Sequence, residues 1–373
     1  MANKGLRRIP HRLAQISFLF FLLRRVSVFY LRKYWKWWVP LVPVGIAVYL
    51  YLLITIPPNI SNSRTDQEKI VRIPRGSSLT EIARILENEE VLTHPTLFVW
   101  LGRVGGYQHR LKAGVFYVPT HLSTYHLLEY MTHPKPATIK VTFPEGERIT
   151  LYASIVQKRL GIDSARFVQL ANDPNFCREL GISASSLEGY LLPETYFFPY
   201  DISAREVLRF LVRQTLSIFQ EDSVRRQMQR LGMSMHQILT LASIIEGEAM
   251  VDSERVLISS VYHNRLKRGW RLQADPTIQY LIPGKPRRLL LKDLEIDSPY
   301  NTYKYAGLPP GPINNPGRRS IMAALYPAKT SYLYFVATGD GGHHFSRTAA
   351  EHARWKRKFD RVRRQVRRSR ISQ

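Results

Sequence analysis

The stretch LASIIEGEAMVDSER, residues 241–255, begins as a buried-helix pattern and then gathers four acidic residues within nine positions. Apolar residues recur along it at the spacing of one helical face, which predicts a core-facing helix from about Met235. Glu246 and Glu248 fall on opposite flanks of that face, each roughly 80° from its centre. Helix geometry therefore leaves two interpretations open for either glutamate. It is a solvated surface group, or a partly desolvated carboxyl at a cleft edge that can act as an acid.

The sequence that follows favours the cleft interpretation. VLISSVYHNRLKRGW (256–270) predicts a second helix, and RLQADPTIQYL (271–281) places Asp275 before a proline in an expected turn. SPYNTYKYAGLPPGPINNPG (298–317) is a polar loop with little to bury, and a loop of that length is usually functional. SYLYFVATGDGGHHFS (331–346) predicts a β-hairpin.

Several chemistries do not fit this sequence. The adjacent His343 and His344 point to opposite faces of a strand, and no H-E-x-x-H or H-x-H accompanies them, so a metal site is not indicated. The sequence has no G-x-S-x-G motif, so a serine hydrolase is not indicated. The glycine-rich TGDGGHH enters a hairpin and is not a phosphate loop, and no cofactor is expected. What remains is glutamate chemistry in an Asn- and Tyr-lined groove, which fits glycoside cleavage by a proton-donating carboxylic acid.

Composition and charge bound the rest of the chain. Its 373 residues leave room for a membrane segment and one or two domains, and the single Cys177 excludes an intramolecular disulfide. The net charge is +25, but nine basic residues lie within positions 1–36 and ten within positions 352–373. The middle is therefore only mildly basic, and a nucleic-acid partner is not expected.

An uncharged segment near the N-terminus predicts a membrane anchor. WWVPLVPVGIAVYLYLLITI (37–56) is 20 residues long, enough to span a hydrocarbon core of about 30 Å. The positive-inside rule places the basic segment 1–36 in the cytoplasm and everything after about residue 57 outside. A cleaved signal peptide is disfavoured by the long basic leader and the absence of an A-x-A site.

The outer part is predicted to be of the α+β class. After a linker at 57–67, a strand, two helices and a returning strand form a small module over 68–136, with a capping box at Ser78 and Glu81. A mixed α+β domain follows over 137–350, and then a basic tail over 351–373. Within that domain, LEGYLLPETYFFPY (187–200) is either a packed aromatic corner or a sugar-facing wall, and the sequence does not choose between them.

Several of these motifs, taken in order, resemble one known family. The chain carries LASIIEGEA, SSVYHNRLKRGWRLQADPT, YNTYKYAGLPPGPINNPG, SYLYFVATGDGGHHF, LEGYLLPETYFF and PEGE, and over residues 68–350 it resembles the YceG-like endolytic murein (lytic) transglycosylases, the MltG family. IPRGSSLTEIARIL and LKAGVFYVP resemble the LysM-like subdomain of that family.

The resemblance implies a lytic enzyme at the bacterial cytoplasmic (inner) membrane, with one N-terminal transmembrane helix and the catalytic domain on the periplasmic face. Such enzymes cut nascent peptidoglycan glycan strands between MurNAc and GlcNAc, leave 1,6-anhydro-MurNAc ends and so terminate glycan elongation. One glutamate protonates the glycosidic oxygen and then takes the proton of the MurNAc C6 hydroxyl as that oxygen attacks C1. Peptidoglycan strands are then the substrate, and peptidoglycan synthases are the expected protein partners.

Carried over residue by residue, the resemblance makes Glu248 the catalytic acid. Two neighbours of Glu248 depart from the family pattern. Ala249 stands where Ser or Thr is typical, and Gly247 stands where a larger residue is usual. Gly247 is expected to loosen the helix beside the acid, and Glu254 is expected to pair with Arg255. The remaining supporting or substrate-binding positions are Glu246, Glu254, Gln273, Asp275, Tyr300, Asn301, Thr302 and His343.

Three other functions are weighed against this one. The first is a membrane-anchored peptidoglycan-binding or scaffold protein without catalysis. The second is a hydrolase in which Asp275 or Asp252 activates water, and the third is a membrane-tethered nucleic-acid binder that uses the basic ends. The basic tail itself is expected either to bind anionic lipid or wall polymer, or to be a solvated helix end.

Overall fold

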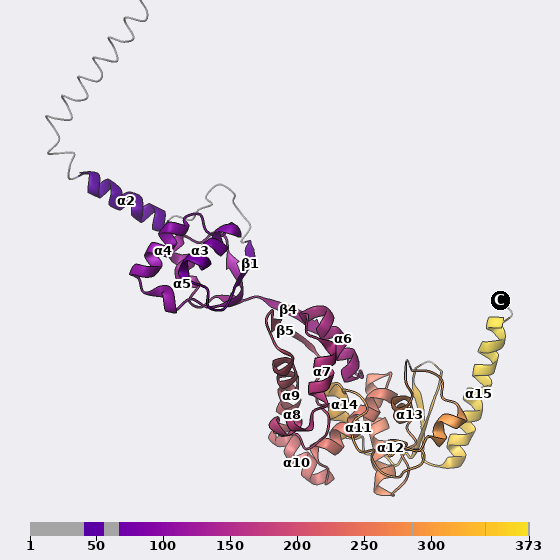
Figure 1. Cartoon of the computed structure of the whole chain (residues 1–373). Helices are drawn as coiled ribbons and strands as arrows, with labels where there is room; N and C mark the ends of the chain where they lie inside the picture. Colours follow the sequence, from indigo (N-terminus) through magenta and orange to yellow (C-terminus); the bar gives the residue numbers. More distant parts are fainter. Residues whose placement is uncertain (1–40, 56–66, 285, 340, 372–373) are drawn as a thin grey trace, which may run out of the picture. The chain divides into compact units, whose positions relative to one another are not determined.

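The structure is a computed structural model that describes residues 41–55, 67–284, 286–339 and 341–371 (Figure 1). It is mixed α+β, which confirms the predicted fold class. Within the described ranges the chain divides into two compact units, with the boundary between Ala137 and Thr138.

The first unit contains a small antiparallel sheet and its covering helices. Its strands are β1 (Glu68–Ile73), β2 (Gly114–Pro119) and β3 (Lys135–Pro136), in the order β1-β2-β3. The helices are α3 (Leu79–Asn88), α4 (Pro95–Val104), the 3₁₀ turn η1 (Tyr107–His109) and α5 (Thr124–Tyr130). The predicted capping box is confirmed, because the Ser78 side chain accepts from the Glu81 N–H and the Glu81 carboxylate accepts from the Ser78 N–H. Whether this unit is LysM-like stays a prediction.

Part of the predicted membrane span lies within the described residues. Helix α2 runs from Leu41 to Thr55, whereas residues 37–40 and 56 of that span, the basic segment 1–36 and linker residues 57–66 lie outside them. Among the described helices, none combines the length and the apolar character needed to cross a bilayer. The transmembrane anchor therefore stays a prediction.

The second unit starts with a two-stranded antiparallel sheet and a layer of helices. Strand β4 (Thr138–Thr142) pairs with β5 (Thr195–Pro199). The helices that follow in chain order are α6 (Ile149–Leu160), α7 (Ser164–Ala171), α8 (Pro174–Glu179), α9 (Ala204–Gln220) and α10 (Asp222–Leu231). Residues 187–200 form a packed aromatic corner, in which Tyr196 and Phe198 lie edge-on against Phe210 and Tyr190 is buried. Phe197 is the exception, with 63% of its surface exposed.

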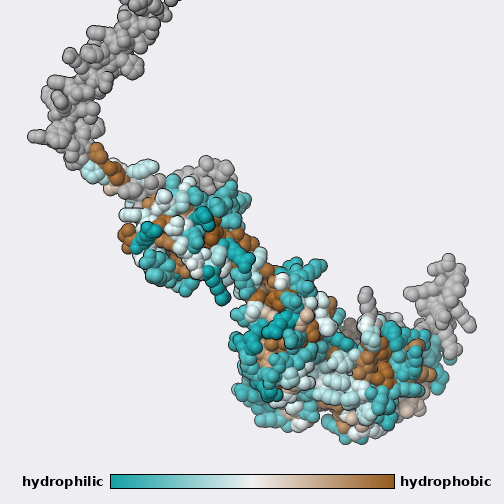
Figure 2. All heavy atoms as spheres, viewed as in Figure 1, coloured by the Kyte–Doolittle hydropathy of each residue, from teal (hydrophilic) through white to brown (hydrophobic). Residues whose placement is uncertain are grey.

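The second half of this unit is built around α11 (Met235–Glu248). It packs against α12 (Arg255–Lys267), α13 (Asp275–Leu281) and α14 (Arg318–Leu325), which gather around it in Figure 1. Residues 238–245 are all buried, so the helix is enclosed on every side, and the expected one-sided stripe is too narrow a description. Figure 2 shows mainly hydrophilic colours on the visible face of this unit, with separate hydrophobic patches.

Short elements complete the unit: the 3₁₀ turns η2 (Asp252–Glu254) and η3 (Leu291–Glu295), the hairpin of β6 (Tyr334–Ala337) and β7 (His343–Ser346), and α15 (Ala349–Ile371). The predicted hairpin is confirmed. The basic tail is helical to Ile371, and its first turns pack on the hairpin, with the Trp355 ring stacked 3.8 Å from the His344 ring. Binding of the tail to anionic lipid or wall polymer stays a prediction.

Candidate functional site

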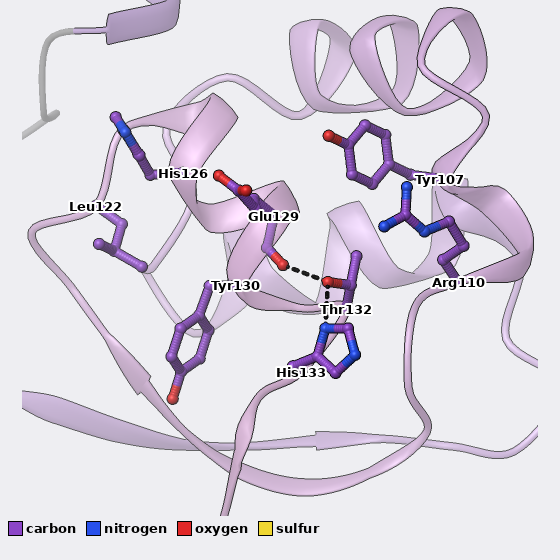
Figure 3. Close-up of a pocket in the computed structure, with 8 residues that line it drawn as sticks. All are labelled: Tyr107, Arg110, Leu122, His126, Glu129, Tyr130, Thr132 and His133. Carbon is purple, nitrogen blue, oxygen red and sulfur yellow. Dashed lines mark hydrogen bonds between the residues drawn. The ribbon is translucent and has the colours of Figure 1, made fainter.

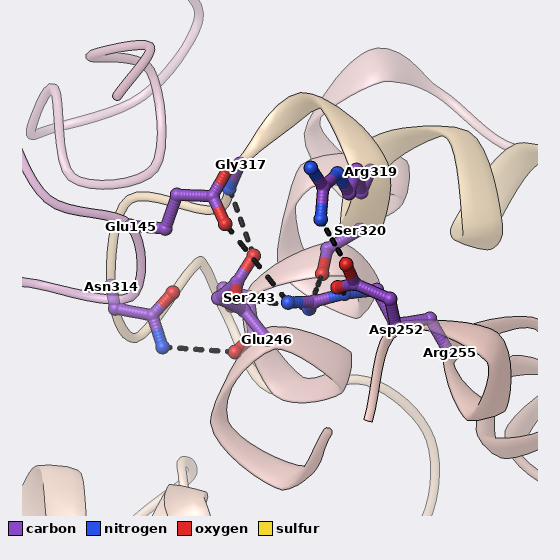
Figure 4. Close-up of polar contacts among 9 residues, drawn as sticks. All are labelled: Glu145, Ser243, Glu246, Asp252, Arg255, Asn314, Gly317, Arg319 and Ser320. Atoms are coloured by element: carbon purple, nitrogen blue, oxygen red, sulfur yellow. Dashed lines mark hydrogen bonds and ion pairs between the residues drawn. The ribbon is translucent and has the colours of Figure 1, made fainter. Parts of the chain in front are cut away.

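The two glutamates of the opening stretch close α11, and each contacts a different set of elements. Arg255 Nη1 donates to Glu246 Oε1 at 2.9 Å, and the Gly317 N–H donates to Glu246 Oε2 at 2.9 Å (Figure 4). Only 6% of the Glu246 side chain and 10% of the Arg255 side chain are exposed, so this is a buried ion pair. Glu246 thus ties the end of α11 to the start of α12 and to the residue that caps α14.

Arg255 is the centre of this polar cluster. Besides Glu246, it donates to Asp252 Oδ1 from Nε at 3.1 Å and to Ser320 Oγ from Nη1 at 2.5 Å. Asp252 also pairs with Arg319, and Glu145 lies 4.0 Å from Arg255 Nη2. Burial and the neighbouring Glu246 charge raise the pKa of Glu145. Two buried charges need such additional partners, because each loses its hydration when it leaves water.

Glu248 has a different environment on the other side of the helix end. Tyr262 Oη, from α12, donates to Glu248 Oε1 at 3.0 Å, and the Asp275 N–H lies close enough to lower the pKa of the same carboxyl. Burial raises the pKa of Glu248 to about 7, the nearby Asp275 carboxylate adds to the rise, and the Tyr262 hydrogen bond opposes it. The residue nevertheless stays partly open to solvent, as a group that must reach a substrate has to. Glu248 can therefore hold a proton near neutral pH and release it.

Asp275 lies near Glu248, and Thr302 bonds to the two residues that precede Asp275, Gln273 and Ala274. Asp275 is the first residue of α13, so the prediction that it lies in a turn is wrong; Pro276, at the first turn, suits a helix start. Gln273 and Asp275 are exposed, whereas Thr302 is buried and its Oγ1 accepts from the Ala274 N–H at 3.0 Å. Thr302 therefore supports the segment that carries Asp275 from within the protein.

The other predicted positions lie elsewhere. Asn301 is fully buried, and its Nδ2 donates to the carbonyls of Leu294 and Ile296, so it holds the loop to η3. The Tyr300 ring packs at a tilt of 34° against the Tyr280 ring, with ring centroids 4.9 Å apart. The predicted loop 298–317 is free of regular secondary structure, but its buried asparagines show that the expectation of little to bury is wrong.

Glu254 and His343 bind each other. The His343 N–H donates to Glu254 Oε1 at 2.8 Å, and His343 Nδ1 lies 2.8 Å from Glu254 Oε2. The prediction that Glu254 pairs with Arg255 is therefore wrong, since each has other partners. This pair joins η2 to the hairpin, and a chain of ring contacts leads from it toward Glu248, because His343 contacts Phe335 and Phe335 contacts Tyr262.

Sequence reasoning missed another desolvated carboxyl, that of Glu188. Its Oε1 accepts from Asn315 Nδ2 at 2.8 Å and from the Ile149 N–H at 3.2 Å, and burial raises its pKa to about 7. Asn315 is fully buried, and its Oδ1 accepts from the Gly189 and Leu191 N–H groups. The missed signal was an acidic residue inside an otherwise apolar, aromatic stretch.

Comparison with known proteins identifies the family. A sequence profile of the YceG-like family matches residues 71–358, which is most of the chain and includes every predicted site residue. The chain belongs to the YceG-like family.

Its relatives share most of the chain. It is 33% identical over 327 residues to the endolytic murein transglycosylase of Bacillus subtilis, covering 83% of this chain and 89% of that protein. It is 28% identical over 340 residues to the endolytic murein transglycosylase of Streptococcus pneumoniae D39, but spans only 60% of that protein's length. A crystal structure of a YceG-like protein from Listeria monocytogenes aligns with a TM-score of 0.55 at 35% identity, covering 78% of this chain and 99% of that one.

The first unit of this YceG-like chain has a pocket of its own, which sequence reasoning did not identify. A cavity of about 510 Å³ lies among Tyr107, Arg110, Leu122, His126, Glu129, Tyr130, Thr132 and His133 (Figure 3). Thr132 Oγ1 donates to the Glu129 carbonyl at 2.7 Å and lies 2.9 Å from His133 Nδ1. The aromatic faces and polar groups can contact a polar ligand, but the acid–base features lie in the second unit.

Proposed function

We propose that this protein is a membrane-anchored endolytic peptidoglycan lytic transglycosylase that cleaves nascent glycan strands between MurNAc and GlcNAc and leaves 1,6-anhydro-MurNAc ends. The observation that carries the proposal is the desolvated Glu248 carboxyl, with its raised pKa and its Tyr262 hydrogen bond, in a chain of the YceG-like family. The name of the Bacillus subtilis relative supports the same activity.

In this proposal Glu248 is the only catalytic carboxyl. Protonated Glu248 donates its proton to the glycosidic oxygen as the bond to MurNAc C1 breaks. The resulting carboxylate then takes the proton of the MurNAc C6 hydroxyl while that oxygen bonds to C1, so protons balance and water is not consumed. Tyr262 Oη and the Asp275 N–H stabilise the carboxylate between the two transfers.

Glu246 and Glu188 suit this step less well. Both oxygens of Glu246 are engaged, by Arg255 Nη1 and by the Gly317 N–H, so this carboxyl holds the end of α11 in place. Glu188 is held between Asn315 and the start of α6, where it ties three chain segments together. We assign both to support of the site, together with Glu254, Tyr300, Asn301, Thr302 and His343. We infer that Gln273 and Asp275, which are exposed, contact the glycan.

The localisation and partners belong to the same proposal. Residues 37–56 anchor the chain in the cytoplasmic (inner) membrane with segment 1–36 inside, and the LysM-like module 68–136 and the catalytic domain 137–350 face outward. Nascent strands are then within reach, and peptidoglycan synthases are neighbours. Removing residues 1–56 should release the protein from the membrane fraction; retention of the shortened chain would contradict the anchor.

Digestion of purified murein sacculi by the full chain in detergent tests the activity. Mass analysis of the fragments should find 1,6-anhydro-MurNAc ends, and Glu248→Gln should lower the rate by about 10²–10⁴-fold. Glu246→Gln and Glu188→Gln are the matched controls and should retain more activity. Reducing ends would indicate a hydrolase, and binding without cleavage would indicate a scaffold protein. Full activity of Glu248→Gln would refute the assignment.

A further inference from the structure

Gly247, between the two glutamates, lies against the start of α13. A Cβ built at this position would lie 2.6 Å from Pro276 Cβ and 2.8 Å from Pro276 Cγ, which is closer than real side chains approach. The backbone at Gly247 is helical, and glycine is a poor helix former. The backbone conformation therefore does not require glycine at this position. What requires glycine is the contact with Pro276.

This contact fixes the residue next to Pro276. Asp275 lies near Glu248, close enough for its charge to raise the pKa of that carboxyl and for its backbone N–H to lower it. Tyr303 Oη donates to Asp275 Oδ1 at 2.5 Å, so the loop 298–317 holds the aspartate from its other side. A shift of α13 away from α11 would therefore move both Asp275 groups away from Glu248.

The preceding residues are held equally firmly. The Gln273 N–H donates to the Thr302 carbonyl at 3.1 Å, and the Ala274 N–H donates to Thr302 Oγ1 at 3.0 Å. Gln273 has a φ of 50°, in the left-handed region that a non-glycine residue adopts at a cost. Such a conformation persists only where its surroundings impose it, and such residues cluster at functional sites.

We propose that residues 273–276 form a clamp on Glu248. The Gly247–Pro276 contact sets the position of this segment, and Thr302 and Tyr303 hold the segment in place. Asp275 adjusts how readily Glu248 releases and regains its proton. The inference rests on the proposed function, in which Glu248 is the acid. It makes Gly247, Asp275 and Pro276 positioning residues, and it replaces the expectation that Gly247 loosens the helix.

The direction of the expected effect follows from the groups that face Glu248. These are Tyr262 and Arg265 from α12, Asp275 from α13, and Tyr303, which acts through Asp275. Burial is the main cause of the raised pKa of Glu248, and the Asp275 charge raises it more than the Asp275 N–H lowers it. Opening the clamp admits water and removes Asp275, so the pKa of Glu248 should fall.

The test is the pH dependence of murein cleavage by the full chain. Activity needs protonated Glu248, so it declines as the pH rises through the pKa of that residue. Gly247→Ala and Asp275→Asn should each move this decline to lower pH, by about one pH unit, and Gly247→Ala should lower kcat more than it changes KM. A purely structural defect would lower the rate at every pH and leave the profile where it was.

A second background isolates the contact itself. In a Pro276→Gly background the atoms that a new Cβ would meet are gone, so adding Gly247→Ala should shift the profile much less than it does beside the proline. Equal shifts of the pH profile in both backgrounds would overturn the clamp. So would an unshifted profile for Gly247→Ala, provided that the variant keeps the native near-ultraviolet circular dichroism spectrum.

The clamp can fail separately from the proposed function. Should the chain leave murein intact, the unfolding temperature still reports the Glu248 proton, because it falls as the pH rises toward about 7. Gly247→Ala should move that fall to lower pH, and Glu248→Gln should remove the Glu248 contribution. An unmoved pH dependence in Gly247→Ala would refute the clamp whatever the activity.

Discussion

At the scale of single residues, the partners of Glu246 and Glu248 distinguish two side chains that are separated by a single residue. Glu246 faces a guanidinium and a backbone N–H, both of which stabilise negative charge. Glu248 is desolvated and lies near a second carboxylate, and together these favour the protonated form more than the Tyr262 hydrogen bond disfavours it. One glutamate therefore joins helices together, and the other is able to exchange a proton.

The first residue-scale prediction concerns Glu246. Glu246→Gln leaves the Arg255 charge buried with only its remaining partners, so the free energy of unfolding should fall by about 2–4 kcal/mol. Urea denaturation of the full chain measures this. Glu221→Gln is a control at an exposed ion pair with Arg318, and it should change stability by less than about 1 kcal/mol. Equal losses of stability in the two variants would show that the buried Glu246–Arg255 pair contributes no more than the exposed Glu221–Arg318 pair.

A second prediction concerns Tyr262. Tyr262→Phe removes the hydrogen bond that lowers the pKa of Glu248, so that pKa should rise and cleavage should persist to higher pH than in the parent chain. The maximal rate should fall, because the carboxylate formed after the first proton transfer loses a donor. Tyr332→Phe, at a ring that stacks on Phe345, is the control and should leave the profile unchanged. A shift to lower pH in Tyr262→Phe would contradict this account.

At the scale of secondary structure elements, local pattern predicted α3, α4, α11, α12 and the hairpin. The capping box of α3 is encoded within a few residues, so sequence alone identified it. Strand β5 was missed because its proline and aromatic residues indicate an irregular segment, and only its pairing with β4 makes it a strand. The helix start at Asp275 depends likewise on support from Thr302, 27 positions further along the chain.

The same reason limits prediction of the site. A helical wheel placed Glu246 and Glu248 symmetrically, because it contains neither Gly317 nor Tyr262, which lie far along the sequence. The family resemblance pointed to Glu248, but it offered no account of Gly247, whose contact with Pro276 exists only once α13 has packed. The types of residue and their order along the chain predicted the chemistry, whereas tertiary contacts make Glu246 and Glu248 different from each other.

The loop 298–317 leads to a prediction at this scale. Asn315 is fully buried and bonds to Gly189, Leu191, Glu147 and Glu188, so it joins three segments that are distant in sequence. Asn315→Ala leaves several buried donors and acceptors unpaired and should lower the free energy of unfolding by about 3 kcal/mol or more. Asn175→Ala, at an exposed position, is the control and should change it by about 0.5 kcal/mol or less.

At the scale of the whole molecule, the buried carboxyls make stability depend on pH. Glu188 and Glu248 both have a pKa of about 7 in the folded chain against an ordinary value of 4.5. Between these values the folded state binds more protons than the unfolded state, so stability is greatest below about pH 4.5 for these two groups and is lost as the pH rises to about 7. Asp293, with a pKa lowered to about 2, acts in the opposite direction only below its ordinary value of 3.8.

We therefore expect the free energy of unfolding of the full chain to fall between about pH 4.5 and 7, with these carboxyls as a main cause. Each group contributes on the order of 2 kcal/mol, since one pKa unit corresponds to about 1.4 kcal/mol and solvent access reduces the effect. The Glu188→Gln/Glu248→Gln double variant carries no proton to lose, so its pH dependence should be flatter, and it should be the more stable chain near pH 8. Urea denaturation across the pH range measures the difference. Parallel curves for the two chains would show that neither carboxyl keeps its proton on folding, and the acid role of Glu248 would lose its physical basis.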